Sequence, residues 1–139
     1  MADKQLEQDE IYFEFAADFK MLRLLRDSTA NLLSKLGFSS EAINNTLLII
    51  NEAFADIIEY SYDFDRTKII IVKVLITDAG VEFVFRDFGR VNEILQRLEK
   101  NRGTIQSDTK DISLIEKLAD DYFIKKVDKG NELHIIKNK

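Results

Sequence analysis

The 139-residue sequence contains no cysteine, no proline and a single histidine, His134. The lack of cysteine excludes disulfide bonds, metal sites built from thiolates and cysteine nucleophiles. One histidine excludes histidine-rich zinc sites and leaves little room for a Ser-His-Asp arrangement. His134 alternates with Leu133 and Ile135 in a predicted terminal strand, which favours a surface or half-buried structural role for it.

An excess of positive charge and long apolar runs are missing as well. The net charge is -5 and the pI is near 5.0, whereas a general nucleic-acid binder normally carries a basic face. The first ten residues are polar and acidic, unlike a signal peptide. The longest apolar run, residues 69–72, is much shorter than the roughly 20 residues that span a bilayer. We therefore expect a cytoplasmic protein that binds neither nucleic acid nor membrane.

The composition that remains is that of an ordinary globular protein, with 45% hydrophobic and 32% charged residues. The length predicts one domain, large enough to bury a core without disulfides. Residues 1–10 read as a flexible N-terminus, and residues 11–139 as a single domain without an internal repeat or linker.

The first half of the chain predicts a strand and two helices. Residues 11–15 alternate as a strand does. Asp18 is a suitable N-cap for a helix that ends before Gly37. Ser39 or Ser40 caps a second, strongly apolar helix that runs to about residue 62. We expect this second helix to be the most buried one.

The second half predicts two hairpins and two further helices. The hairpins pair residues 68–77 with 81–86 and 122–127 with 132–137, and the helices cover 91–101 and 112–118. This order predicts a two-layer α/β sandwich, with helices on one face of a mixed, mostly antiparallel sheet. The hairpins argue against a doubly wound parallel sheet. Core positions are expected at Ile50 and Phe54 and at Phe13, Phe15, Phe83 and Phe85 in the strands.

Four carboxylates lie on one side of the second helix, namely Glu52, Asp56, Glu59 and Asp63. At 100° per residue they fall within about 60° of one another, and like charges four residues apart cost roughly 0.2–0.5 kcal/mol. Spacing alone favours a solvated acidic face. The alternative is an edge that binds magnesium and a nucleotide, where a carboxylate supplies one ligand and phosphate oxygens and waters complete the octahedron.

Two short motifs carry a family resemblance. Residues 52–56 read Glu-Ala-Phe-Ala-Asp on the second helix, and residues 87–91 read Asp-Phe-Gly-Arg-Val after the first hairpin. A helix with Glu and Asn or Asp, followed by two strands that end in Asp-x-Gly, resembles the ATP-binding fold of the anti-sigma-factor serine kinases. These are histidine-kinase-like ATPases. The resemblance covers roughly residues 10–138 and implies that fold.

The resemblance also implies roles for four residues and a Mg-ATP cofactor. Glu52 matches the general base, and Asp56 stands where the family has an Asn that ligates magnesium. Asp87 matches the carboxylate that accepts a hydrogen bond from the adenine amino group, and Gly89 matches the first glycine of that motif. We expect the four residues to converge on one cleft. The partner implied is a sigma factor or the anti-sigma antagonist that the family phosphorylates in bacterial transcription regulation.

Three positions depart from the family's nucleotide motifs. Val91 replaces the second glycine of the adenine motif, and a β-branched residue tolerates neither positive φ nor close backbone approach. Asp111 and Ser113 replace the two glycines at the start of a helix whose amides would receive phosphate. A carboxylate at residue 111 would repel that phosphate. We therefore expect weakened or lost ATP binding.

Three functions remain open from the sequence. The first is a regulatory domain related to the anti-sigma kinases that acts by protein binding. The second is an active ATP-dependent serine kinase of that family, and the third is the detached ATPase domain of a histidine-kinase system. Residues 87–89 also spell the Asp-Phe-Gly triplet of eukaryotic-type protein kinases, but the chain lacks their Gly-rich strand and His-Arg-Asp loop. The sequence also leaves open whether the protein forms a homodimer, for which the first strand and the first helix are candidate interface elements.

Overall fold

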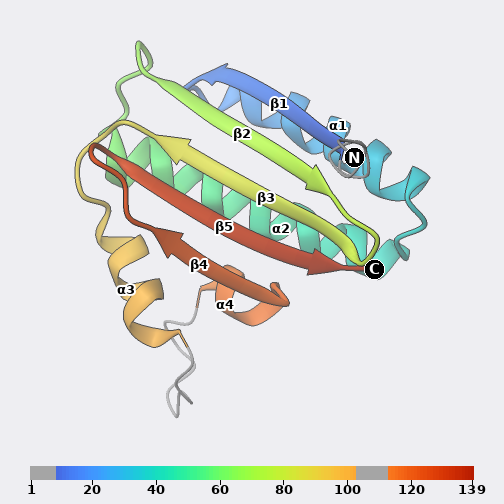
Figure 1. Cartoon of the computed structure of the whole chain (residues 1–139). Coiled ribbons are helices and arrows are strands. Elements are labelled where there is room, and N and C mark those ends of the chain that lie inside the picture. The colour runs from blue at the N-terminus through green and yellow to red at the C-terminus, as the bar shows by residue number, and fades with distance from the viewer. Residues whose placement is uncertain (1–8, 103–112) are drawn as a thin grey trace, which may run out of the picture.

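The computed structural model describes residues 9–102 and 113–139. In these ranges five strands form one sheet in the order β1-β2-β3-β5-β4, and every neighbouring pair is antiparallel (Figure 1). The strands are β1 (Asp9–Ala16), β2 (Ile69–Ile76), β3 (Gly80–Asp87), β4 (Asp121–Lys125) and β5 (Asn131–Asn138). Both expected hairpins, β2–β3 and β4–β5, are confirmed. The expected flexible N-terminus lies mostly outside the described residues, and residues 9 and 10 belong to β1.

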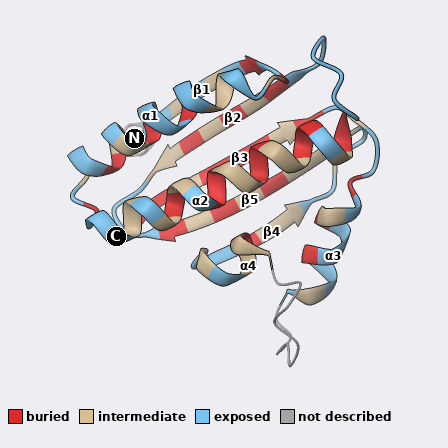
Figure 2. Ribbon diagram, turned by 180° about the vertical axis from the view of Figure 1, so that it is seen from behind, coloured by how far each residue is buried: buried red, intermediate tan, exposed pale blue. Residues whose placement is uncertain are grey.

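The helices lie on one face of the sheet, which confirms the two-layer α/β architecture (Figure 2). They are α1 (Lys20–Lys35), α2 (Ser40–Asp56), the π-helical η2 (Ile57–Ser61), α3 (Glu93–Asn101) and α4 (Leu114–Leu118). Figure 2 shows α1 and α2 running along the strands, with α3 and α4 beside the β4 edge. None of these helices has the length and apolar character needed to cross a membrane.

Local sequence explains where α1 and α2 begin and where α1 ends. The N-cap position of α1 is Phe19, one residue after the predicted cap, and Asp18 instead accepts a hydrogen bond from the backbone N–H of Lys20, the first residue of the helix, at 3.1 Å. Gly37 has a φ of 90°, which lets the chain leave α1 in the left-handed conformation. The Ser39 hydroxyl accepts the Ala42 N–H at 3.1 Å and caps α2.

The core lies between α2 and the inner face of the sheet. Ile50 and Phe54 on α2 are fully buried, and the Phe54 ring meets Phe15 of β1 edge-on at 5.9 Å. Phe83 and Phe85 of β3 are buried as well. Five of the predicted core positions are therefore confirmed, whereas Phe13 of β1 is half-buried and packs against this core. The 3.6-residue and two-residue periods of these segments meet in one layer.

Two elements of the second half are shorter than the sequence suggested. α3 begins at Glu93, and not at residue 91, because Asn92 caps it by accepting the N–H groups of Ile94 and Leu95. α4 spans only Leu114–Leu118, with Ser113 as its cap. The prediction about Asp111 falls outside the described residues.

The other face of the sheet carries His134 in a structural role, as expected. Its two ring nitrogens lie 2.6 Å from a Glu82 carboxylate oxygen and 2.7 Å from a Glu132 oxygen. The imidazole stacks on Phe123 with ring centroids 4.4 Å apart. These cross-strand contacts join β3, β4 and β5 on the face that the helices leave uncovered.

Truncating Phe54 to Ala is expected to lower the free energy of unfolding by roughly 3–5 kcal/mol, because it leaves a cavity at a fully buried position. Leu48→Ala is the matched control on the same helix, since Leu48 is 43% exposed, and it should change stability by less than about 0.5 kcal/mol. Denaturant unfolding of both variants measures the difference. Equal losses in the two variants would contradict this placement of α2.

Candidate functional site

Asp87 lies at the end of β3 with no exposed surface. In the described part of the chain, three groups donate to its carboxylate: the Ser61 hydroxyl at 3.0 Å, the Gly89 N–H at 2.9 Å and the Asn131 side-chain amide at 2.9 Å. Burial raises the pKa of Asp87, and these hydrogen bonds oppose that rise. The carboxylate thus joins the end of η2, the turn after β3 and the start of β5.

Ser61 reaches Asp87 because α2 continues as the π-helix η2. The Tyr62 N–H bonds the Ile57 carbonyl, five residues back, at 3.0 Å. The Ser61 hydroxyl is buried and also accepts the Asn92 side-chain amide at 2.9 Å. That amide lies 3.3 Å from the Asp56 carbonyl oxygen, so Asn92 joins the junction to the end of α2.

Two glycines allow the three segments to approach this closely. A Cβ on Gly89 would overlap the backbone carbonyl of Ser61, and the Arg90 N–H donates to that same carbonyl at 3.0 Å. Gly130 has a φ of 86°, and a Cβ there would overlap the Asp87 carbonyl. Gly89 is thus required by contact with the chain's own backbone.

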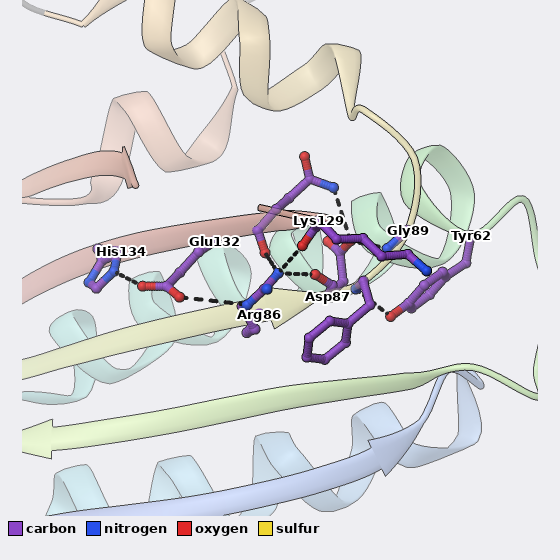
Figure 3. A network of polar contacts seen from close by, with 9 residues as sticks. Tyr62, Arg86, Asp87, Gly89, Lys129, Glu132 and His134 are labelled. Atoms are coloured by element: carbon purple, nitrogen blue, oxygen red, sulfur yellow. Dashed lines mark hydrogen bonds and ion pairs between the residues drawn. The ribbon is translucent and has the colours of Figure 1, made fainter. Parts of the chain in front are cut away.

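Arg86 extends the junction across the uncovered face of the sheet (Figure 3). Its guanidinium donates to the carbonyls of Asp87 and, at 2.8 Å, Lys129. It also lies 4.2 Å from the centre of the Phe88 ring and 3.8 Å from a Glu132 oxygen. These contacts hold the β4–β5 turn against the end of β3.

A pocket of about 210 Å³ lies between α2 and η2 on one side and α3 and α4 on the other. Its lining includes the carboxylates of Glu52, Asp56 and Glu116, with Arg97 as the one basic residue among the described lining residues. The remaining lining residues are Tyr60, Ile94, Leu98 and Ser113. Among the described residues, no group of three or more acidic or histidine side chains is arranged to hold a metal ion.

Glu52 is engaged by the start of α4. Its carboxylate accepts a hydrogen bond from the Ser113 hydroxyl and another from the Leu114 N–H, the latter at 3.0 Å. Ser113 in turn accepts the Ile115 N–H at 3.0 Å. A negative group at a helix N-terminus is favourable. Glu52 therefore supplies a negative charge at the start of α4 and engages the Leu114 N–H there.

Asp56 stands one turn after Glu52 with an unsatisfied carboxylate. Its Oδ2 is buried and has no hydrogen-bond partner among the described residues, and the same holds for Oε1 of Glu116. Burial, followed by the charges of Glu52 and Glu59, raises the pKa of Asp56 from 3.8 to about 7. The protonated form of Asp56 is thus well populated near neutral pH.

The four predicted site residues therefore occupy two neighbouring places. Glu52 and Asp56 line the pocket, whereas Asp87 and Gly89, which the structure also describes, form the buried junction and are not among its lining residues. Asn92 connects the two places through its side-chain amide. Val91, at the position of the second motif glycine, is 68% exposed.

Sequence reasoning missed three polar residues of the junction, Ser61, Asn92 and Asn131. One local signal was available for Asn92, because an Asn directly before Glu-Ile-Leu is a typical N-cap. Ser61 and Asn131 meet Asp87 only through the fold, since they lie 26 and 44 residues from it in the sequence.

Asp56→Asn is expected to change how stability depends on pH. Because the folded-state pKa of Asp56 is raised to about 7, the native protein keeps a proton that the unfolded chain loses above about pH 4. This group therefore lowers the free energy of unfolding as the pH rises from about 4 to about 7, by on the order of 2–4 kcal/mol. The Asn variant cannot titrate at this position, so its free energy of unfolding does not fall in this way. Its free energy of unfolding minus that of the wild type should therefore increase from about pH 4 to about pH 7 and then level off.

Denaturant unfolding at several pH values between about 4 and 8 measures this advantage. Glu59→Gln is the control, because it removes one of the charges that raise the pKa of Asp56. In this variant the free energy of unfolding should stop falling at a lower pH than in the wild type. A difference between the wild type and Asp56→Asn that stays constant with pH would contradict the account.

The comparisons with known proteins agree with this architecture. The family model described as "Histidine kinase-like ATPase domain" matches residues 15–137. The serine-protein kinase RsbW of Bacillus cereus is 23% identical, with 67% of this chain and 67% of that protein covered. A crystal structure of the RsbU and RsbW domains of Rv1364c from Mycobacterium tuberculosis matches with a TM-score of 0.65 and 16% identity. That match covers 91% of this chain and 31% of the solved one. The chain belongs to the family of histidine kinase-like ATPase domains.

Proposed function

We propose that this chain is an anti-sigma-factor-like regulatory domain that acts by binding a protein partner and whose ATP binding is weakened or lost. Its similarity to a protein named serine-protein kinase RsbW supports the regulatory class. The observation that carries the proposal is the bond between Glu52 and the start of α4. The group that should serve as general base is held by the chain itself.

The Glu52 contact opposes nucleotide binding in two ways. In the related kinases the amides at this helix start receive phosphate, and here the Leu114 N–H already donates to the Glu52 carboxylate. A triphosphate would have to displace that carboxylate or lie beside it. Two opposed negative charges a few ångströms apart repel by about 1–4 kcal/mol at a surface-like dielectric, so the affinity falls by up to several decades.

The carboxylate of Asp87 is also engaged in hydrogen bonds within the protein. Reading an adenine amino group requires an accessible carboxylate oxygen, and Asp87 is fully buried with three donors from the chain. If the Asp87 carboxylate turned towards a nucleotide, the Ser61 hydroxyl and the Asn131 amide would lose a hydrogen-bond acceptor. Leaving a buried polar group unpaired costs about 1–3 kcal/mol.

The residues present do not fit Mg-ATP in this arrangement. The pocket has about 210 Å³, whereas pockets for drug-sized ligands have roughly 300–1,000 Å³. Among the described motif residues, Asp56 has a carboxylate oxygen without a partner, and its pKa of about 7 leaves much of it near neutral pH in the protonated form, which ligates magnesium poorly. Among the described lining residues, three carboxylates face a single arginine, Arg97, which gives an anionic ligand little compensation.

The alternative is an active serine kinase of the same family, and one observation favours it. Asp56 and Glu116 line the pocket beside Glu52, and each has a buried carboxylate oxygen without a partner among the described residues, so single ligands for a cation are present. In this reading Glu52 would act as general base and Asp56 as magnesium ligand once the contact with α4 opened. Asp87 and Gly89 would hold the adenine.

The partner we propose is a sigma factor or a small anti-sigma antagonist, as in partner switching of transcription regulators. A homodimer is compatible with this function. Neither a nucleic acid nor a membrane is part of the proposal, in keeping with the net charge of -5.

A calorimetric titration with Mg-ATP tests the proposal. We expect no saturable binding below roughly 1 mM, because a loss of about 4 kcal/mol weakens a micromolar site about a thousandfold. In the same series, a partner from the purified sigma factors and antagonists of the source organism should bind with equal affinity in the presence and absence of Mg-ATP.

Micromolar Mg-ATP binding that is lost in Asp56→Ala would contradict the proposal and favour the kinase. Transfer of phosphate to an antagonist serine, abolished in Glu52→Gln, would establish that alternative. Leu48→Ala serves as the control, since Leu48 lies on the same helix and does not line the pocket.

A further inference from the structure

The pocket between α2, η2, α3 and α4 contains buried hydrogen-bond acceptors that the described residues leave unsatisfied. Oδ2 of Asp56 and Oε1 of Glu116 are buried, and neither has a partner among these residues. Both side chains line the pocket of about 210 Å³. Because an unpaired buried acceptor destabilises a protein, a donor bound in the pocket would stabilise this one.

The charge of the pocket favours a cation. Its described lining holds three carboxylates, those of Glu52, Asp56 and Glu116, against the guanidinium of Arg97. Arg97 is exposed, so that solvent screens its charge, whereas the two unpaired carboxylate oxygens are buried. Water can pair with these oxygens, since a cavity of this volume holds several waters, but it does not neutralise their charge. A positively charged donor does both.

An organic ammonium group suits these acceptors better than a metal ion. Magnesium demands a nearly octahedral shell of oxygens at about 2.0–2.1 Å. In the described part of the chain, no group of three or more acidic or histidine side chains is arranged to hold a metal ion. An ammonium group has three rotatable N–H donors and needs no fixed shell of ligands. Glu52 is already engaged by the start of α4, so Asp56 and Glu116 are the acceptors that remain.

Apolar side chains in the same pocket can accommodate a carbon chain. Ile94 and Leu98 lie one turn apart on α3, and Tyr60 adds an aromatic ring from η2. Burial of an alkyl chain against such side chains is favourable, and so is a cation over an aromatic ring. The volume of about 210 Å³ suits a small ligand, because pockets for drug-sized ligands have roughly 300–1,000 Å³. These features together favour a short alkyl chain that ends in a cation.

We propose that this pocket binds a primary ammonium group on a short alkyl chain, with Asp56 and Glu116 as acceptors and Ile94, Leu98 and Tyr60 around the chain. A free aliphatic amine and a lysine side chain of a protein partner present this same chemistry. The inference rests on the proposed loss of ATP binding, since it assigns to the pocket a ligand whose charge is opposite to that of a nucleotide. The bound group joins α2 to α4 through the two carboxylates.

A titration of the complete chain with n-butylamine, followed by NMR amide chemical shifts at constant ionic strength, tests the proposal. At pH 8 the Asp56 carboxyl, with a pKa of about 7, is mostly ionised, and the amine stays charged because alkylammonium groups such as that of lysine have a pKa of about 10.4. We expect saturable shifts at Tyr60, Leu98 and Ser113 with a Kd of about 1 mM or below. n-Butanol, which has the same chain without the charge, should produce none.

Two charge-removing variants locate the binding site. Asp56→Asn and Glu116→Gln each remove one negative charge with little change in size, and each should weaken n-butylamine binding at least tenfold. Glu99→Gln is the matched control, because Glu99 is exposed on α3 and is not among the described lining residues, and its Kd should stay within about twofold of wild type. The spectra without ligand show whether each variant is folded. Equal affinity in the wild type and both pocket variants would overturn the proposal.

The outcomes distinguish this inference from the function on which it rests. If neither n-butylamine nor Mg-ATP binds, the inference is overturned and the proposed function stands. Micromolar Mg-ATP binding overturns the proposed function, and the inference with it. Magnesium chloride that binds more tightly than n-butylamine, and loses its binding in Asp56→Asn, would assign the carboxylates to a metal ion and overturn the inference alone.

A competition experiment identifies the source of the ammonium group. The sigma factor or antagonist that binds the wild type is titrated with and without saturating n-butylamine. Partner affinity that falls at least fivefold with the amine, and falls similarly in Glu116→Gln, supports a lysine side chain of the partner. Unchanged partner affinity, with n-butylamine still bound, supports a free amine. Failure of n-butylamine to bind at all overturns both forms.

Discussion

The buried carboxylate of Asp87 is the interaction that holds this end of the molecule together. A carboxylate without access to water is tolerated only when hydrogen bonds replace its hydration. Here the donors come from η2, from the turn after β3 and from the start of β5. Next to it, Asn92 at the start of α3 hydrogen-bonds the end of α2, and Arg86 hydrogen-bonds the β4–β5 turn. The walls of the neighbouring pocket are therefore positioned by one buried group.

The same residue types serve two purposes in this fold. An aspartate and a glycine after β3 suit an adenine site, but they equally suit a junction in which the carboxylate is buried and a Cβ at Gly89 would overlap the Ser61 carbonyl. Likewise, Glu52 suits general-base chemistry and also suits the hydrogen bond that it accepts from the Leu114 N–H at the start of α4. We infer that this chain has kept the scaffold of an ATPase domain while its own groups took over contacts made with nucleotide elsewhere in the family. A regulator that binds proteins is the function that this exchange favours.

The parts of the fold that depend on local periodicity could be predicted from the sequence. Alternation identified β1, the Ser39 cap placed the start of α2, and the apolar period placed Phe54 in the core. The extension of α2 by a π-helix had no sequence signal, yet it decides where Ser61 points. Apart from Gly89, which lies two residues from Asp87, the partners of Asp87 and Glu52 come from segments 26 to 62 residues away, so their contacts depend on how the elements pack. For that reason the sequence identified the polar residues of the site more readily than their partners.

A double-mutant cycle between Asp87 and Asn131, measured without nucleotide, tests the central claim most directly. The free energies of unfolding are compared for the wild type, Asp87→Ala, Asn131→Ala and the double variant. Because the two side chains bond at 2.9 Å in a buried site, we expect a coupling of about 1–3 kcal/mol. Losses that add within about 0.5 kcal/mol would show that Asp87 is not held by the chain. They would contradict the view that intramolecular contacts occupy this site.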